Sequence, residues 1–191
     1  MLFRSMIKAV FFDIDGTLVS FKTHKLPDST VRALDLLREK GIKVFIATGR
    51  QLQSINNLGT QEFDGYVTLN GGYCLAGKDK VIYKHNIPSG DIEALIRYQE
   101  NEEAFPCALV EEDGIYQNYV DDSVRQLYDM LDFPHPPLRP LRGNGGKEVY
   151  QLIAFFSPGH EERIMSVLPH CEATRWRSEE RRVGKECRSR W

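Results

Sequence analysis

The sequence predicts an α/β protein, in which a doubly wound parallel core carries an inserted α+β domain. Two observations lead to this prediction. Up to residue 72, short apolar runs alternate with a helical pattern, as in parallel strands joined by crossovers. Beyond residue 72, the pattern changes to hairpins and separate helices, which indicates an antiparallel unit. We therefore expect the N-terminal part of the core in residues 1–72 and the inserted domain in residues 73–177.

Three apolar runs are expected to form the parallel strands of the core. They span residues 9–12, 44–47 and 66–69. Because each run is continuously apolar, we expect both faces of the sheet to be buried. A helix is predicted after the first strand, since Pro27, Asp28 and Ser29 are start signals and Gly41 stands where a C-terminal cap is needed. A second helical connection is expected before the third strand.

The inserted domain is expected to contain two hairpins, three helices and two further strands. The hairpins span residues 73–83 and 107–119, with turns at residues 77–80 and 113–114. The helices span residues 91–103, 122–131 and 159–168, and the further strands span residues 148–156 and 171–176. This mixture, without regular alternation, is typical of an α+β unit.

The last residues of the chain, 178–191, are expected to lie outside the fold. Residues 175–191 contain seven Arg or Lys against three Glu. Such a run is typical of a solvated tail, and a basic arm for nucleic acid is an alternative. The string also resembles translated adaptor or vector sequence at the end of a truncated reading frame, which is the interpretation we favour.

The composition is that of an ordinary globular protein. Of 191 residues, 41% are hydrophobic and 27% are charged, which is enough for a buried core. The formal net charge of -2 gives no reason to expect nucleic acid or a membrane as partner. The four cysteines form no CxxC pair, and neither a secretory signal nor a long apolar run is found, so a cytoplasmic protein is expected.

Two aspartates at the end of the first strand are the strongest functional signal. In the stretch DIDGT, Asp13 and Asp15 reach the same side because side chains alternate along a strand. One aspartate can attack phosphorus, and a second can give a proton to the departing oxygen and then take one from water. We expect Asp13 to be the nucleophile and Asp15 the acid and base. The alternative, that both only cap a turn, does not explain so specific a pattern after a strand.

The loop around these aspartates is expected to bind phosphate and a cation. Two carboxylates would repel a phosphate dianion, and oxygen ligands favour Mg²⁺, so Asp13 and Asp15 are candidate metal ligands. Gly16 allows the backbone to turn and bring its N–H groups near the phosphoryl oxygens. Thr17 can stabilise the conformation of the loop.

The loops after the second and third strands should add further ligands, since ligands bind beyond the carboxyl ends of the strands in such sheets. Thr48 and the N–H of Gly49 offer hydrogen-bond donors to phosphate. Arg50 either binds phosphate or pairs with a core carboxylate. Asn70 and Gly71 either contact the ligand or only form a tight turn.

Three stretches, FFDIDGTLVS, VFIATGR and YVTLNGG, resemble motifs of the haloacid dehalogenase superfamily, in its Cof-type branch with a large C2-type α/β cap. The resemblance covers roughly residues 6–177. It implies a phosphatase that acts on small phosphorylated metabolites such as sugar phosphates. By this resemblance Asp13 carries the phosphoryl group, Asp15 is acid and base, the Asp13 carboxylate and the Asp15 carbonyl bind Mg²⁺, Thr48 holds phosphate, and the cap selects the substrate.

The sequence also departs from the pattern of this family. A lysine that steadies the phosphate and an acidic motif that completes the metal site are expected beyond the cap, and neither is present. Lys185 lies in the tail, so the role of that lysine is not transferred to it. We therefore expect a core that stops near Trp176 and a chain that is inactive as it stands. A phosphomutase of the same superfamily and a non-enzymatic phospho-acceptor module are the alternatives.

Overall fold

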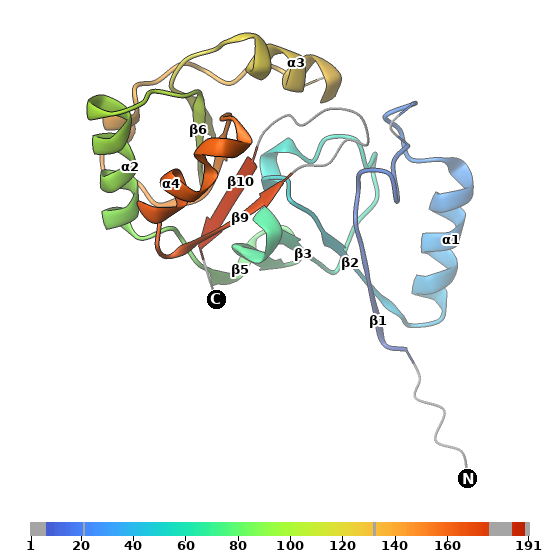
Figure 1. Ribbon diagram of the computed structural model, residues 1–191. Helices are drawn as coiled ribbons and strands as arrows, with labels where there is room; N and C mark the ends of the chain where they lie inside the picture. Colours follow the sequence, from blue (N-terminus) through green and yellow to red (C-terminus); the bar gives the residue numbers. More distant parts are fainter. Residues whose placement is uncertain (1–6, 21, 132, 176–184, 190–191) are drawn as a thin grey trace. The chain divides into compact units, whose positions relative to one another are not determined.

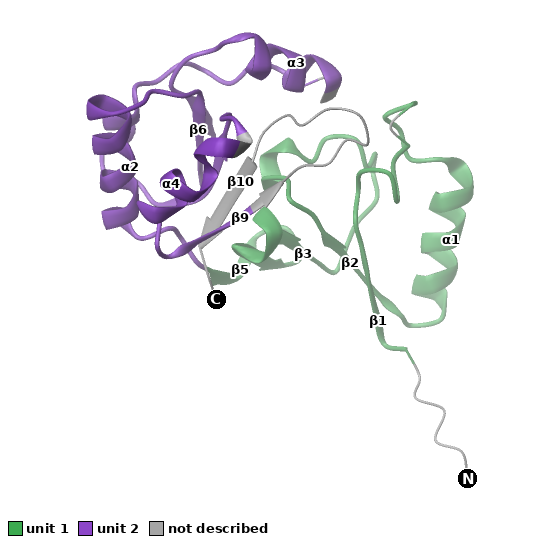
Figure 2. Ribbon diagram, viewed as in Figure 1, with its two compact units in different colours: residues 1–84 green, residues 85–191 purple. Residues whose placement is uncertain are grey.

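The structure is a computed structural model that describes residues 7–20, 22–131, 133–175 and 185–189. The chain divides into two compact units, unit 1 with residues 1–84 and unit 2 with residues 85–191 (Figure 2). Each unit contains a five-stranded sheet, parallel in its first part in unit 1 and antiparallel in unit 2. The predicted fold class is therefore confirmed.

Unit 1 begins with three parallel strands. They are β1 (Ala9–Phe12), β2 (Lys43–Ala47) and β3 (Gly65–Thr68), which lie in this order in the sheet (Figure 1). Phe12 lies opposite Ile46, and Ile46 lies opposite Tyr66. Because the strands are parallel and in close register, their carboxyl ends meet at one edge of the sheet.

Helix α1 (Asp28–Glu39) joins the first two strands and ends where the sequence predicts. Gly41 has a φ of +70°, a left-handed conformation that glycine adopts without strain. Its N–H donates a hydrogen bond to the carbonyl oxygen of Arg38 at 2.9 Å. This arrangement is a normal glycine cap at a helix end, so the predicted cap is confirmed.

The connection from β2 to β3 differs from the predicted helical crossover. Among residues 48–64 it contains one short 3-10 helix, η1 (Leu52–Ser54). Asn56, Asn57 and Gly59 account for the difference, because Asn and Gly disfavour the interior of an α-helix. Gly59 has a left-handed φ of +61°. The prediction of a helix here is wrong, although β3 is parallel to β2 as expected.

The hairpin of β4 (Tyr73–Ala76) and β5 (Lys80–Lys84) extends the sheet of unit 1. A short 3-10 turn, η2 (Leu69–Gly71), sends the chain straight back, so that β4 pairs antiparallel with β3. The hairpin is predicted to lie in the inserted domain of residues 73–177. In the structure it belongs to the sheet of unit 1, and unit 2 begins at His85.

Strand β1 has an exposed face, contrary to the prediction of burial on both faces. Val44 and Ile46 of β2 are completely buried, whereas Phe11 of β1 is 55% exposed. Phe11 stacks on Phe45 with ring centroids 4.7 Å apart. In the described sheet, β1 is an edge strand with β2 as its one neighbour.

Unit 2 is an antiparallel sheet with helices packed against it. The strands, in spatial order, are β7 (Ile115–Gln117), β6 (Cys107–Glu111), β8 (Val149–Ala154), β10 (Lys185–Ser189) and β9 (Cys171–Arg175). The helices are α2 (Ser89–Asn101), α3 (Asp122–Leu131) and α4 (Glu161–Ser166), with 3-10 turns η3 (Leu141–Asn144) and η4 (Pro158–His160). Leu95 of α2 and Ile164 of α4 share a buried core with Leu109 and Leu152 of the sheet.

Strand β10 belongs to the tail that the sequence analysis leaves out of the fold. It pairs antiparallel with both β8 and β9, with Glu186 opposite Ile153 and Thr174. The structure therefore places part of the tail in the sheet, while residues 176–184 and 190–191 lie outside the described residues. Strand pairing uses backbone groups that every sequence has. The foreign origin of residues 178–191 thus stays a prediction.

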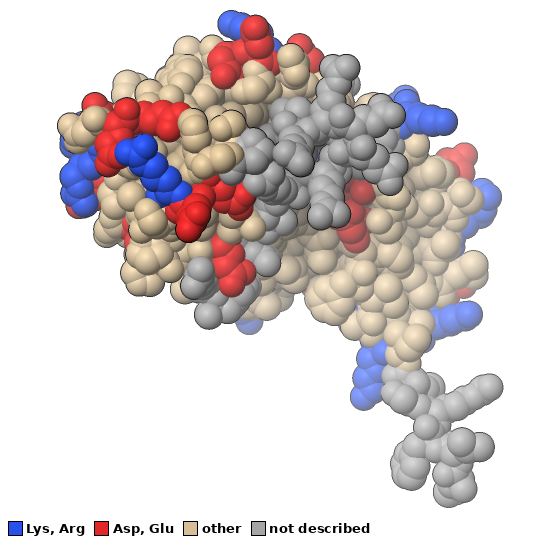
Figure 3. Space-filling model, in the orientation of Figure 1, with Lys and Arg blue, Asp and Glu red and all other residues tan. Residues whose placement is uncertain are grey.

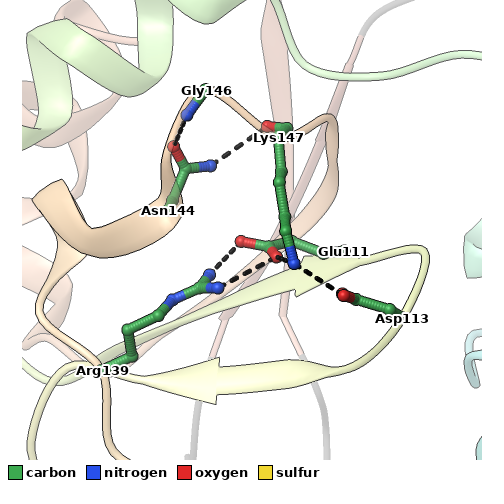
Figure 4. A network of polar contacts seen from close by, with 6 residues as sticks. All are labelled: Glu111, Asp113, Arg139, Asn144, Gly146 and Lys147. Atoms are coloured by element: carbon green, nitrogen blue, oxygen red, sulfur yellow. Dashed lines mark hydrogen bonds and ion pairs between the residues drawn. The ribbon is translucent and has the colours of Figure 1, made fainter.

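A buried ion pair holds the β6–β7 hairpin of unit 2 (Figure 4). The side chain of Glu111 is 1% exposed and accepts two hydrogen bonds from Arg139, one of them from Nη1 at 3.1 Å. The Arg139 guanidinium carbon lies 3.7 Å from the ring centroid of Tyr116. Lys147 Nζ lies 2.6 Å from Asp113 and 3.7 Å from Glu111. These contacts join the hairpin to the loop that holds Arg139 and Lys147.

The surface carries charges of both signs. On the visible face of unit 2, acidic and basic side chains are intermingled (Figure 3). Exposed ion pairs also occur in unit 2, such as that of Arg97 and Glu93. This mixed face differs from the one-sided basic surface that nucleic-acid binding uses. Within the described residues, no helix has the length and apolar character needed to cross a membrane.

Candidate active site

The ends of β1, β2 and β3 bring the three predicted motifs to one edge of the sheet in unit 1. Asp13 follows β1 directly, Thr48 follows β2 directly, and Asn70 lies in the turn after β3. The N–H of Thr48 donates to the carbonyl oxygen of Val67 at 2.9 Å, and the N–H of Asn70 donates to the carbonyl oxygen of Thr48 at 3.2 Å. Backbone hydrogen bonds therefore join the second and third loops.

The first loop turns tightly after Asp13. Gly16 has a φ of +78°, and its N–H donates to the carbonyl oxygen of Val19 at 2.8 Å. The N–H of Val19 donates to the carbonyl oxygen of Ile14 at 2.9 Å, and the backbone N–H of Thr17 donates to the same oxygen at 3.3 Å. Gly16 therefore serves the turn, and its own N–H is used inside the loop. Thr17 is exposed.

Asp13 and Asp15 have different surroundings. Ile14 between them is completely buried. Asp13 is exposed, whereas both carboxylate oxygens of Asp15 accept hydrogen bonds from Arg50. Partial desolvation raises the pKa of Asp13, and the Asp15 charge adds to this, while the Ile14 N–H and the Arg50 charge lower it. The loop thus holds one open carboxylate and one fixed carboxylate.

Arg50 joins the first and second loops. Its Nε lies 2.7 Å from Asp15 Oδ2, and its Nη2 lies 2.5 Å from Asp15 Oδ1. Its Nη1 donates to the carbonyl oxygen of Ser54 at 3.2 Å. Of the two alternatives in the sequence analysis, the structure shows the pairing with a carboxylate. One edge of the guanidinium, formed by Nε and Nη2, reaches both oxygens of Asp15. Contact of Arg50 with phosphate stays an untested prediction.

Thr48 lies at the base of this loop. Its side chain is buried, and its hydroxyl oxygen accepts a hydrogen bond from the backbone N–H of Arg50 at 3.2 Å. The next residue after Arg50, Gln51, is also buried. No local signal predicts the burial of Gln51, because a glutamine in a loop is normally exposed and its sequence neighbours do not indicate a buried position.

The side chain of Asn70 lies against Gly49. A Cβ atom added to Gly49 would lie 3.2 Å from Asn70 Oδ1, so glycine leaves room for this amide. Asn70 has a left-handed φ of 54°, and Gly71 has a φ of 97°. The predicted tight turn is present, and it places the amide beside the second loop. Contact of Asn70 and Gly71 with a ligand stays a prediction.

Two oxygen groups of the aspartate loop would suit a magnesium ion. The Asp13 carboxylate and the backbone carbonyl of Asp15 are oxygen donors of the kind that Mg²⁺ prefers. The Asp15 carboxylate is engaged at both oxygens by Arg50, so the metal role that we predict for Asp15 is limited to its carbonyl. In the part of the chain that the structure describes, no group of three or more His, Cys, Asp or Glu could hold a metal ion.

Comparison with known proteins identifies the family. A family model described as haloacid dehalogenase-like hydrolase matches residues 10–181, which include the aspartate loop and nearly all of unit 2. The chain belongs to this family. The resemblance to its Cof-type branch is confirmed, since a solved structure named as the HAD subclass IIB sugar phosphatase BT4131 is 38% identical, with a TM-score of 0.81. That match covers 95% of this chain and 70% of the other.

Other relatives of this haloacid dehalogenase-like chain are also named as phosphatases. The structure of BT1666 from Bacteroides thetaiotaomicron, named among phosphatases of the superfamily, is 31% identical with a TM-score of 0.85, over 99% of this chain and 70% of that one. "Putative phosphatase YkrA" of Bacillus subtilis is 30% identical over 88% of this chain. "HMP-PP phosphatase" of Shigella flexneri is 28% identical over 70% of it. The chain spans 65% and 52% of the length of these last two relatives.

Proposed function

We propose that this chain carries the nucleophile and the substrate-selecting domain of a magnesium-dependent phosphatase, which acts on small phosphorylated metabolites through an aspartyl phosphate. The observation that carries the proposal is the pair of unlike aspartates after β1. Asp13 is open, as a nucleophile must be, and Asp15 is held by Arg50, as a directed acid and base should be. The names of several relatives support the class of reaction.

The first step transfers the phosphoryl group to Asp13. One carboxylate oxygen of Asp13 attacks phosphorus, and the bond between phosphorus and the ester oxygen breaks. Asp15 gives a proton to the departing oxygen, which leaves as an alcohol. The Thr48 hydroxyl and the N–H of Gly49 stand at the neighbouring strand end, where they can donate hydrogen bonds to the phosphoryl oxygens.

The second step returns Asp13 to its free form. Asp15 takes a proton from a water molecule, the water oxygen attacks phosphorus, and inorganic phosphate leaves as the acyl phosphate bond breaks. When bound, Mg²⁺ would be held by the Asp13 carboxylate and the Asp15 carbonyl, and it would offset the negative charge that gathers at this point. The fixed orientation of Asp15 serves both steps.

Unit 2 is proposed to select the substrate. The motif loops of unit 1 supply chemistry that is common to all phosphate esters, so discrimination must come from other residues. The relatives named as a sugar phosphatase and as an HMP-PP phosphatase favour small phosphorylated metabolites, with sugar phosphates as the first class to test.

The proposal is tested with a completed chain, defined as residues 1–175 followed by the continuation of their natural reading frame, to the length of the relatives. It is assayed with Mg²⁺ against a panel of sugar phosphates, nucleotides and an aryl phosphate. The variant Asp13→Asn is compared with Asp79→Asn, which changes an exposed aspartate in the β4–β5 turn of the same unit. We expect the unsubstituted chain and the Asp79→Asn variant to hydrolyse these esters. We expect the Asp13→Asn variant to be inactive. Substantial hydrolysis by Asp13→Asn would overturn the proposal.

A further inference from the structure

We infer that Arg50 is a positioning residue that orients Asp15 for proton transfer, and that it does not bind the phosphoryl group. The inference rests on the proposed function, in which Asp15 is the acid and base. It predicts that Arg50 matters most for esters with a poor leaving group, because those esters depend most on a proton from Asp15.

Each nitrogen of the Arg50 guanidinium group has a protein partner. Its Nε and Nη2 donate to the two oxygens of Asp15 at 2.7 and 2.5 Å, and its Nη1 donates to the Ser54 carbonyl oxygen at 3.2 Å. Because only 9% of the side chain is exposed, little of the group is open to a phosphate oxygen.

The two-point contact determines how the Asp15 carboxylate is oriented. A carboxylate bound through one oxygen can still rotate, since the terminal torsion of Asp is broad. A planar guanidinium that binds both oxygens fixes the plane of the carboxylate as well as its position. Asp15 is 32% exposed and lies on a loop, so this contact is a strong determinant of its geometry.

The chemistry of the leaving group separates a positioning role from phosphate binding. An alkyl phosphate releases a strongly basic oxygen that needs a proton as its bond to phosphorus breaks. A 2,4-dinitrophenyl phosphate releases a weakly basic oxygen that needs none. Loss of orientation at Asp15 therefore slows the first ester selectively. Loss of a phosphate ligand would slow both esters alike and would weaken inhibition by inorganic phosphate.

The test compares Arg50→Gln and Arg50→Lys in the completed chain, and Arg38→Gln serves as the control. Arg38 also binds a carboxylate, that of Asp35 within α1, and it donates to Gln61 and Glu62 of the same unit. For Arg50→Gln we expect kcat/KM to fall about 100-fold for a primary alkyl phosphate, the size of effect that a misplaced catalytic group produces. We expect changes of about twofold or less for 2,4-dinitrophenyl phosphate and for the Ki of inorganic phosphate. Arg50→Lys keeps the positive charge but not the planar two-point contact with Asp15. We therefore expect this variant to fold and still to lose most of the kcat/KM for the alkyl phosphate.

A double-mutant cycle with Asp15→Asn completes the test. If Arg50 acts through Asp15, the variant with both Asp15→Asn and Arg50→Gln should be no slower than Asp15→Asn alone. Additive losses, or equal losses for the two esters together with a weaker phosphate Ki, would overturn the inference and make Arg50 a phosphate ligand. An unsubstituted completed chain that hydrolyses neither ester would instead overturn the proposed function. If Arg50→Gln does not fold, the same comparison of kcat/KM for the two esters is made with Arg50→Lys.

Discussion

At the scale of single residues, the pKa of Asp13 links the candidate mechanism to pH. Partial desolvation raises this pKa above the usual value of an aspartate. Only the ionised form can attack phosphorus, so kcat/KM of the completed chain should begin to fall, as the pH is lowered, at a higher pH than an ordinary aspartate would give. A pH–rate profile checks this. The prediction would be contradicted if kcat/KM fell on the acidic side at the pKa of an unperturbed aspartate.

The same shift predicts how Asp13 affects stability. Since folding raises the pKa of Asp13, its contribution to stability is present below the unfolded pKa and is lost as the pH rises through the folded pKa. Asp13→Asn should therefore raise the Tm of the 191-residue chain near pH 7 and leave it unchanged near pH 3. Thermal unfolding at the two pH values measures this, with Asp79→Asn as the control. A lower Tm for Asp13→Asn at pH 7 would show that the sign is wrong.

The location of the site could be predicted from the sequence, but its internal contacts could not. DIDGT, TGR and NGG follow three apolar runs, and the ends of parallel strands must meet, so their proximity follows from the strand pattern. The partner of Arg50 lies 35 residues away, and its choice depends on side-chain placement that no local pattern encodes. The role of Gly16 was only partly predicted, because its N–H closes the turn.

At the scale of secondary-structure elements, the Glu111–Arg139 pair should stabilise unit 2. Arg139→Ala would leave the Glu111 carboxylate buried with Lys147 at 3.7 Å as its remaining described cation. Breaking a buried pair in this way should lower the free energy of unfolding by about 3 kcal/mol. Urea unfolding measures the change. Arg142→Ala, which breaks the exposed pair with Glu100, is the control and should have little effect. A change in Arg139→Ala as small as in the control would refute this account.

A second prediction follows from the proposal that unit 1 carries the phosphoryl chemistry and unit 2 selects the substrate. If residues 85–175 of the completed chain are exchanged for the corresponding part of a relative, the preferred phosphate ester should change, while activity should still depend on Asp13. The reason is that the motif loops contact the phosphoryl group that all substrates share. Measuring kcat/KM over the same panel before and after the exchange tests this. An unchanged order of preference would place specificity in unit 1.

The elements themselves were largely predictable, because periodicity and turn residues are local signals. β1 and α3 have the predicted bounds, and Gly41 ends α1 as expected. Strand partners are not local. The hairpin after Gly71 pairs with β3, and this depends on the path of a turn that the sequence does not reveal. The exposure of Phe11 was missed for the same reason, since an apolar run shows what a strand can bury and not what covers it.

At the scale of the whole molecule, the 191-residue chain is predicted to be a poor catalyst. The candidate metal ligands of this chain are one carboxylate, that of Asp13, and one carbonyl, that of Asp15, whereas Mg²⁺ needs a near-octahedral set of oxygens. Phe11 is exposed, and β1 is an edge strand in the described part of the sheet, and both features favour aggregation. Loss of one preorganised group costs about 10²- to 10³-fold in rate, and at least that is expected here relative to the completed chain.

Two measurements check this prediction. Hydrolysis of a generic aryl phosphate is compared between the 191-residue chain and the completed chain, and Mg²⁺ binding to each is followed by calorimetry. We expect weak binding and a low rate for the shorter chain. Comparable rates would show that residues within the 191 carry the whole reaction.

The central claim is that Asp13 carries the phosphoryl group, and trapping the phospho-enzyme tests it most directly. Asp15→Asn should slow the breakdown of an aspartyl phosphate formed from an ester with a good leaving group, because water then lacks its base. The completed chain with Asp15→Asn is mixed with 2,4-dinitrophenyl phosphate, quenched in acid and reduced with borohydride, which converts an acyl phosphate of aspartate into homoserine. The account predicts homoserine at position 13 by mass spectrometry. Release of dinitrophenol with no reduced residue, or with homoserine at another position, would contradict it.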